Sequence, residues 1–410
     1  MILHYAYNIF KFKKWKLLLF IGISCTLLLM KNVVTQYLYP SVTQLAEIHK
    51  CPACYGASVC HNVHKINISW RISTILFYLY GTESVFFGAY NQNKVVLKKL
   101  APPSELEAFD IVYCKKFYLE YPCSNVSKKK LNRHIADFND LIKKIITSDF
   151  SEDDSSRLRL CPTTRHIDDL FHNIYLNYKH TNPIEYLINL WTLVSINPEP
   201  LILQILPAEN GWPVPKYFGA CGRIIIAEHV GLTLADYFDK PWIQRARIAS
   251  SLLNAAYMFT FKNENFSFYL TDVTADNIAV DHNDEAKFID LEHIIIVDKN
   301  ISPKKKSEEW HALQENRMHL DCPNCSAFSP KEICNHYLSD HNYYVICQLL
   351  LGLGNENSFP GFLHDIPVDI QWQSANIEYL LQQCALPTSN DSRIIFGQQL
   401  KASLDTLLKK

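Results

Sequence analysis

The chain has 410 residues, of which 48% are hydrophobic and 20% are charged. This length supplies one large domain or two lobes around a cleft, and the composition excludes an intrinsically disordered chain. The 40 basic residues nearly balance the 41 acidic ones, so no overall positive charge points to a nucleic-acid partner.

The first 40 residues carry a targeting pattern. Four lysines between positions 11 and 16 precede an uncharged apolar run from Leu17 to Met30. The run is shorter than the roughly 20 residues of a typical spanning helix. A cleaved signal peptide and an uncleaved signal anchor with a luminal carboxyl end both fit it. Either one predicts a secretory-pathway protein of the ER or Golgi lumen, anchored in the membrane as a type II protein or secreted.

The cysteines agree with this compartment. Thirteen are present, and all but Cys25 lie beyond the apolar run, which leaves an even number to form disulfides whose connectivity the sequence leaves open. Two C-x-x-C pairs, at 51–54 and 322–325, offer zinc as an alternative, but disulfides are favoured. Six N-x-S sequons add weak support for glycosylation, at Asn67, Asn125, Asn265, Asn300, Asn324 and Asn390.

Residues 41–230 read as a cysteine-bearing lead-in and a strand-rich lobe, with a helical insert at about 104–196. Two short β-type runs, 84–90 and 94–100, are separated by N-Q-N and predict a hairpin. Helical spacing after an opening proline predicts a helix over 183–194. Strands are expected at 197–207 and at 223–230.

Residues 231–410 are mainly helical in pattern. We expect a helix over 242–261, a polar loop over 271–277, two short strands around the turn 282–285, and a helical tail from residue 340. The sequence therefore predicts an α+β fold of two lobes, a strand-rich N-lobe and a helical C-lobe, after the N-terminal hydrophobic segment. Clefts at such junctions are the usual ligand sites.

Four polar residues stand in an order that suits phosphoryl transfer. Lys98 ends an apolar strand, Asp272 and Asn277 share the polar loop, and Asp290 follows the second short strand. Phosphoryl transfer needs a carboxylate for the attacking hydroxyl, metal ligands for the ion on the phosphates, and a cation on the phosphates. A lysine on an apolar face also needs a carboxylate partner, for which Glu105 is slightly preferred over Glu185.

This constellation resembles the protein-kinase motifs V-A-I-K, H-R-D-x-x-x-x-N and D-F-G. From Cys51 onward the chain is similar to the divergent protein kinase domain 2 family, the deleted-in-autism-1 proteins. The similar stretches include C-P-A-C-Y-G, V-V-L-K-K-L, N-P-E-P-L-I-L-Q, G-W-P-V-P-K-Y-F-G-A-C-G-R, D-V-T-A-D-N and D-H-N-Y-Y-V-I-C-Q. The resemblance implies a kinase-like fold, passage through the Golgi and possible secretion as a signalling factor.

By the same resemblance, Lys98 looks like the phosphate-binding lysine and Asp272 like the catalytic base. Asn277 and Asp290 look like ligands of Mg²⁺ or Mn²⁺ bound with ATP. The segment 228–234 resembles the hinge beside the adenine, and Asp340 resembles the aspartate that braces the catalytic loop, with a helix N-cap as its alternative role.

Several positions depart from the kinase pattern. No G-x-G-x-x-G precedes Lys98, Leu270 and Thr271 stand before Asp272, and Leu291 and Glu292 follow Asp290. Three hypotheses follow. The chain is an ATP-dependent kinase acting on a luminal or extracellular protein, or a pseudokinase that acts as a secreted or Golgi-resident binding protein, or a disulfide-rich ectodomain without a nucleotide site.

Overall fold

The computed structural model describes residues 39–70, 84–116, 158–172, 174, 183–316, 328–352, 360–374, 376–388 and 392–409. The predicted hydrophobic segment at 17–30 lies outside these residues, as does the second C-x-x-C pair at 322–325. None of the helices in the described part of the chain has the length and hydropathy needed to cross a bilayer.

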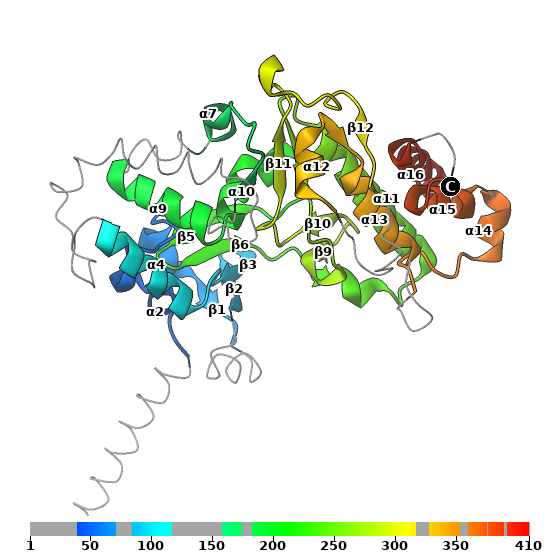
Figure 1. Ribbon diagram of the computed structural model, residues 1–410. Coiled ribbons are helices and arrows are strands. Elements are labelled where there is room, and N and C mark those ends of the chain that lie inside the picture. Colours follow the sequence, from blue (N-terminus) through cyan, green and yellow to red (C-terminus); the bar gives the residue numbers. More distant parts are fainter. Residues whose placement is uncertain are drawn as a thin grey trace, which may run out of the picture.

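An antiparallel sheet forms the centre of the first half of the chain (Figure 1). Its strands, in spatial order, are β1 (Asn67–Ile68), β2 (Val85–Tyr90), β3 (Asn93–Lys98), β6 (Ile224–Glu228) and β5 (Tyr217–Cys221). The predicted hairpin is confirmed as β2–β3, with Asn91 and Gln92 at positive φ in its turn. Alternation along β3 buries Val95 and Leu97 on one face and leaves Val96 and Lys98 on the other.

The segment that precedes the sheet packs against it. It forms α2 (Val42–Ala46), η1 (Ile48–Lys50) and η2 (Cys60–Lys65). Gly222 has a φ of 57°, and a Cβ there would lie 2.0 Å from the carbonyl oxygen of Ala46. Its neighbour Arg223 donates to the carbonyl oxygens of Lys50 and Ala53 and pairs with the buried Asp110 at 2.5 Å. These contacts explain why G-A-C-G-R stands here: it joins the sheet, the lead-in and the helix Pro103–Lys116, which holds Asp110.

Three helices accompany the sheet: α4 (Pro103–Lys116), α9 (Pro183–Ser195) and α10 (Glu199–Ile205). The expected helix at 183–194 is confirmed, and most of the predicted insert between α4 and α9 lies outside the described residues. The expected strand at 197–207 is wrong. The apolar run of α10 is buried on all sides, so its sequence lacks the periodicity that separates a helix from a strand. A proline in its first turn was the overlooked helix signal.

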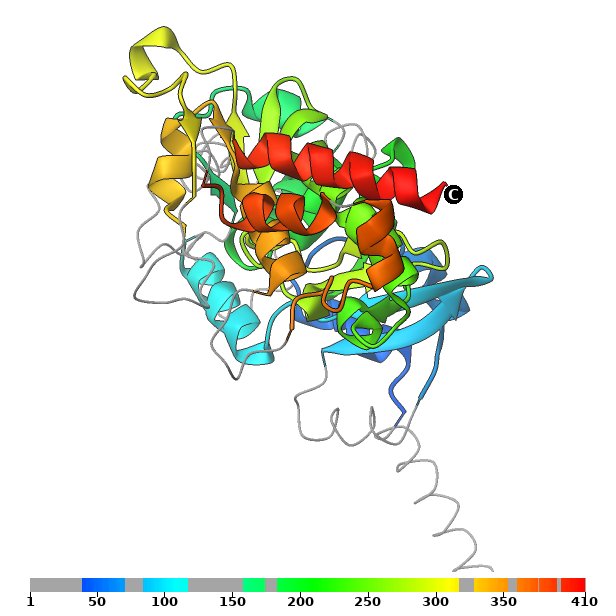
Figure 2. The ribbon, with the colours of Figure 1, turned by 90° about the vertical axis from the view of Figure 1, so that its right-hand side faces the viewer.

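The second half of the chain is mainly helical. Figure 2 shows its helices from the side, with the C-terminal α16, in red, on the face that is turned toward the viewer. The main helices are α11 (Trp242–Phe261), α12 (Pro330–Asn335), α13 (His341–Leu351), α14 (Val368–Gln373), α15 (Ile377–Ala385) and α16 (Arg393–Leu408). The bounds predicted for α11 are correct, and the helical tail is confirmed.

Short strands connect these helices. The two predicted strands around the turn 282–285 are β9 (Ile278–Val280) and β10 (Ala286–Phe288), which pair with β7 (Leu232–Thr233) in the order β10-β9-β7. Another small sheet has the order β4-β11-β8, and β12 pairs with β13. These strands were not predicted: β4 (Arg159–Leu160), β8 (Phe266–Tyr269), β11 (Ile295–Asp298), β12 (Leu313–Gln314) and β13 (Leu338–Ser339).

Four disulfides have both cysteines among the described residues: Cys51–Cys54, Cys60–Cys221, Cys161–Cys334 and Cys347–Cys384. The first closes the C-x-x-C pair at 51–54, so a disulfide, not a zinc ion, occupies those thiols, as favoured from the sequence. Disulfides of this number are consistent with folding in the secretory pathway.

Candidate functional site

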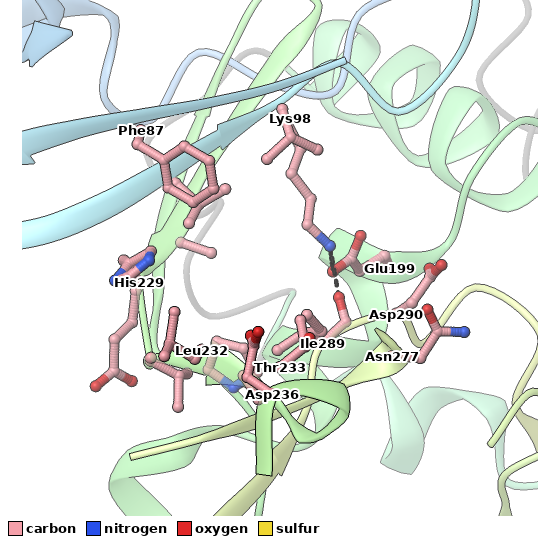
Figure 3. Close-up of a pocket in the computed structure, with 18 residues that line it drawn as sticks. Phe87, Lys98, Glu199, His229, Leu232, Thr233, Asp236, Asn277, Ile289 and Asp290 are labelled. Carbon is pink, nitrogen blue, oxygen red and sulfur yellow. Dashed lines mark hydrogen bonds and ion pairs between the residues drawn. The ribbon is translucent and has the colours of Figure 1, made fainter. Parts of the chain in front are cut away.

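A cavity of about 470 Å³ lies where the sheet meets the second half of the chain (Figure 3). The sheet side is mostly apolar, and the opposite side carries amide and carboxyl groups. The lining residues include Val85, Phe87, Val96, Lys98 and Ala227 from the sheet, and Thr233, Asp236, Asn277, Ile289 and Asp290 from the segments that face it. The volume is within the usual range of small-molecule sites.

Lys98 points from β3 into this cavity, toward a carboxylate that the sequence reading did not consider (Figure 3). Its Nζ lies 2.6 Å from Oε1 of Glu199, at the start of α10, and 2.5 Å from the carbonyl oxygen of Ile289. Neither Glu105, in the first turn of α4, nor Glu185, in that of α9, is the partner of Lys98. The missed partner lies in N-P-E-P-L-I-L-Q, and the error follows from reading that segment as a strand.

Burial raises the pKa of the Glu199 carboxyl to about 7; Lys98 opposes this shift, and the nearby Asp290 and Glu292 add to it. Only 2% of the Glu199 side chain is exposed. A carboxyl with a raised pKa holds its proton in the folded state at pH values where the unfolded chain has lost it. Glu199 therefore opposes folding increasingly as the pH rises from about 4.5 to about 7.

We expect Glu199→Gln to remove part of the pH dependence of stability. The free energy of unfolding of the unmodified chain should fall between about pH 4.5 and 7 more steeply than that of the variant, because the Gln amide has no proton to lose. Denaturant unfolding across this range measures both. Glu185→Gln, at an exposed glutamate, is the matched control and should follow the unmodified chain. If the free energy of unfolding changed with pH in the same way in all three proteins, the raised pKa of Glu199 would be contradicted.

The polar loop between β8 and β9 places Asp272 and Asn277 side by side. Asn277 Nδ2 donates to Asp272 Oδ2 at 2.9 Å and to its carbonyl oxygen at 3.3 Å. Asn277 ends the short turn η6 (Ala275–Asn277) and lines the cavity. Asp272 is exposed, so its carboxylate is accessible to a substrate that approaches from solvent.

Asp290 follows β10 and reaches the same cavity (Figure 3). The amide of Ile289 donates to the carbonyl oxygen of Asn277 at 3.0 Å, which ties the end of the hairpin to the loop. Burial raises the pKa of Asp290; Lys98 opposes the shift, while Glu292 and Asp272 add to it. The site thus concentrates negative charge around Asp290, which favours a bound cation.

Glu292, which stands two residues after Asp290, is held at the edge of the site. Asn197 Nδ2 donates to its carboxylate and also to the carbonyl oxygen of Leu100, 3.3 Å away. The side-chain oxygen of Asn197 accepts from the amide of Glu199 at 2.9 Å. One asparagine therefore links the end of β3, the start of α10 and the segment after Asp290.

Helix α13 braces the loop, but not through the expected residue. His341 Nε2 donates to the carbonyl oxygen of Leu270 at 2.8 Å, and Asn342 Oδ1 accepts from its amide at 3.0 Å. Burial lowers the pKa of His341 to about 4, so the ring is neutral at physiological pH. Asp340 occupies the N-cap position of α13 without capping it, and binds Arg393 and the amide of Asn316 instead.

The segment expected to be a hinge, 228–234, runs along the edge of the cavity. Residues 228–233 line the cavity, and the backbone of this segment pairs with neighbouring strands through the His229 amide and through β7. Lys287 Nζ and the amide of Lys216 each lie 3.0 Å from the Glu228 carboxylate, which fixes the start of the segment.

Comparison with known proteins finds relatives that span most of this chain. A family model described as the protein-kinase domain of FAM69 matches residues 190–387. Divergent protein kinase domain 2A of Xenopus tropicalis is 32% identical over 384 residues, which cover 88% of this chain and 87% of the relative. The chain belongs to the divergent protein kinase domain 2 family.

Two human members of the family are also similar to this chain over most of their length. Divergent protein kinase domain 2A of Homo sapiens is 31% identical, over 88% of this chain and 87% of the relative. Human divergent protein kinase domain 2B is 26% identical, over 88% of this chain and 82% of the relative. The family resemblance seen in the sequence is confirmed, and with it a mixed α+β chain that contains a kinase-like domain.

Proposed function

We propose that this chain is a secretory-pathway kinase that binds ATP with Mg²⁺ or Mn²⁺ and transfers the γ-phosphate to a hydroxyl of a luminal or extracellular protein. One observation carries the proposal. Lys98, Asn277 and Asp290 line a single cavity, and Asp272 is hydrogen-bonded to Asn277 beside it. The alternative of a disulfide-rich domain without a nucleotide site does not explain why these residues, which are distant in sequence, lie together.

The residues around the cavity fit the proposed ligand. Lys98 offers an ammonium group to the phosphates, and Asn277 and Asp290 offer oxygen ligands of the kind that Mg²⁺ prefers. The apolar side chains of Val85, Phe87 and Val96 offer a surface on which a base can pack. The divalent ion, when bound, neutralises charge on the phosphates.

The side chains of this chain then have distinct tasks. The Asp272 carboxylate accepts the proton of the attacking hydroxyl, and Asn277 holds that carboxylate in place through the 2.9 Å hydrogen bond. Glu199 positions the Lys98 ammonium, which would exchange its contact with the Ile289 carbonyl for a phosphate oxygen. His341 and Asn342 hold the start of the loop from beneath.

Lys98→Met is expected to abolish stabilisation by nucleotide, because it removes the cation nearest the phosphates. In a thermal-shift experiment, ATP with Mn²⁺ at a hundredfold its dissociation constant should stabilise the unmodified chain by about 2.7 kcal/mol. Lys94→Met is the matched control, since Lys94 is exposed on the same strand, and it should keep the shift. A chain that shows no shift, or a shift that survives Lys98→Met, would contradict nucleotide binding in this cavity.

A pseudokinase that binds its partner without catalysis is the second candidate, and the β2–β3 hairpin favours it. The one glycine of β2, Gly88, faces strand β1: a Cβ there would lie 2.6 Å from the carbonyl oxygen of Asn67. That glycine serves sheet packing, so the hairpin offers no glycine-rich backbone for phosphates. Nucleotide-dependent stabilisation without phosphoryl transfer would favour this candidate.

The proposed compartment is the lumen of the ER or Golgi, with the chain either anchored as a type II protein or secreted. The disulfides support an oxidising compartment. Asn67 is exposed in β1 and heads an N-x-S sequon, so it is accessible to a glycan. A mass shift on glycosidase treatment that Asn67→Gln reduces would support the luminal placement, and a cytosolic pool with reduced cysteines would contradict it.

A further inference from the structure

A cluster of three metal-ligating side chains lies away from the cavity, where the segment between β11 and β12 meets α12. Glu309 belongs to that segment, Glu332 lies in the first turn of α12, and His336 is the C-cap residue that directly follows the helix. One ligand atom from each lies within 4.8 Å of those of the other two. Figure 2 shows the segment, in yellow, beside α12, in gold.

The histidine of this cluster is buried, and one of its ring nitrogens is hydrogen-bonded to the backbone. The side chain of His336 is 6% exposed. Its Nδ1 lies 2.7 Å from the carbonyl oxygen of Glu332, and because a carbonyl can only accept, Nδ1 carries the hydrogen. In the neutral ring this places a lone pair on Nε2. A histidine held in this way by a backbone carbonyl is the usual form of a metal ligand.

The lone-pair nitrogen of His336 points at acidic oxygens. Nε2 lies 3.6 Å from Oε2 of Glu309, too far for a hydrogen bond, and makes none with any described residue. Bonds of about 2.0–2.2 Å from a tetrahedral ion to nitrogen and oxygen ligands place neighbouring ligand atoms about 3.4 Å apart. The separation therefore suits a cation between the two groups better than direct contact.

Both sides of the cluster are fixed independently of any ion. Helix α12 is anchored by the disulfide Cys161–Cys334 and by the buried Ile333. The opposing segment is held by Ser307, whose hydroxyl donates to the carbonyl oxygen of Asn335 at 2.5 Å, and by the buried Trp310 next to Glu309. The ligands are thus brought together by the fold, which lowers the free-energy cost of assembling a site.

We propose that Glu309, Glu332 and His336 bind one divalent transition-metal ion of the Zn²⁺ class. One imidazole nitrogen and two carboxylates suit zinc, whereas Ca²⁺ prefers six or more oxygen ligands. None of the three residues lines the cavity proposed for nucleotide, so this ion is separate from one bound by Asn277 and Asp290. The ion fastens the segment that follows β11 to α12.

Calorimetric titration of the chain with ZnCl₂ tests the proposal. The chain is produced without a polyhistidine tag in an oxidising host, stripped with chelator, and titrated in excess Mg²⁺ so that the other acidic site is filled. We expect one saturable zinc site, weakened at least about tenfold by Glu309→Gln, Glu332→Gln or His336→Gln. Glu308→Gln, which removes the same charge from the adjacent exposed residue, should bind as the unmodified chain does.

Two results would overturn the proposal: no saturable zinc binding by the unmodified chain, or a zinc affinity in Glu309→Gln and Glu332→Gln that equals that of the unmodified chain. These two glutamates are exposed, so their variants should keep the fold even if the buried His336 variant does not. Melting temperatures measured in chelator check this point. Asp290→Asn should leave zinc affinity unchanged, which separates this site from the nucleotide cavity.

Discussion

Replacing Asp272 by Asn should lower the rate of phosphoryl transfer by about 10²–10⁴-fold, the usual contribution of a positioned general base. The amide cannot accept the proton of the attacking hydroxyl, yet it fills the same space beside Asn277. Nucleotide binding should persist, because Lys98, Asn277 and Asp290 remain in the cavity. Transfer of the labelled γ-phosphate of ATP to the chain itself or to water measures the rate, and thermal shift measures binding.

Asp276→Asn provides the control for this substitution. Asp276 is exposed in the same loop and lies one residue before Asn277, so the change removes the same charge close to the site. We expect transfer at the rate of the unmodified chain. Equal rates in Asp272→Asn and the unmodified chain would show that another group takes the proton. A chain that transfers no phosphate while binding ATP would be a pseudokinase.

Arg393→Met should be the most destabilising single change considered, at about 3–5 kcal/mol. Arg393 starts α16 and is bonded to Asp340, and 3% and 1% of the two side chains are exposed. It also donates to the carbonyl oxygen of Cys384 at 2.9 Å. Removal of the guanidinium leaves the Asp340 carboxylate buried without its cation. Denaturant unfolding, with the disulfides intact, measures the loss.

The same helix offers a control that changes an exposed ion pair. Lys401 and Asp405 lie 2.7 Å apart with side chains that are 29% and 37% exposed. Lys401→Met should therefore cost less than about 1 kcal/mol. Similar losses for the two variants would mean that the Arg393–Asp340 contact contributes no more than a surface pair does.

The sequence predicts well those elements whose pattern is local. The β2–β3 hairpin follows from two short β-type runs with a polar turn between them, and the bounds of α11 follow from its long helical pattern. The four site residues were placed by order and spacing alone, and the cavity brings together Lys98, Asn277 and Asp290. Asp272 and Asn277 can be recognised from the sequence because they lie only five residues apart in one polar loop.

Such local patterns do not predict which distant segments of the chain come into contact. Glu199 meets Lys98 across 101 residues, and its selection over Glu105 depends on how α10 packs, which no local signal gives. The bracing of Leu270 by His341 and Asn342 depends on where the first turn of α13 lies against the loop. Disulfide partners 161 and 173 residues apart are likewise set by the folded chain, so their pairing could not be read from spacing.

The strand pairing of β4 and the Cys161–Cys334 bond have a mechanical consequence. Leu158 is bonded to the end of α9, next to the sheet, while β4 runs parallel to β11 in the helical half. In the described part of the chain, the two halves are therefore joined by the contacts that border the cavity and also by this stretch, which the disulfide fixes covalently. A molecule synthesised under reducing conditions would keep the strand pairing but lose its covalent fixation, so we expect it to open more readily. Preparations from a bacterial cytosol should accordingly differ from secreted material in compactness as well as in oxidation state.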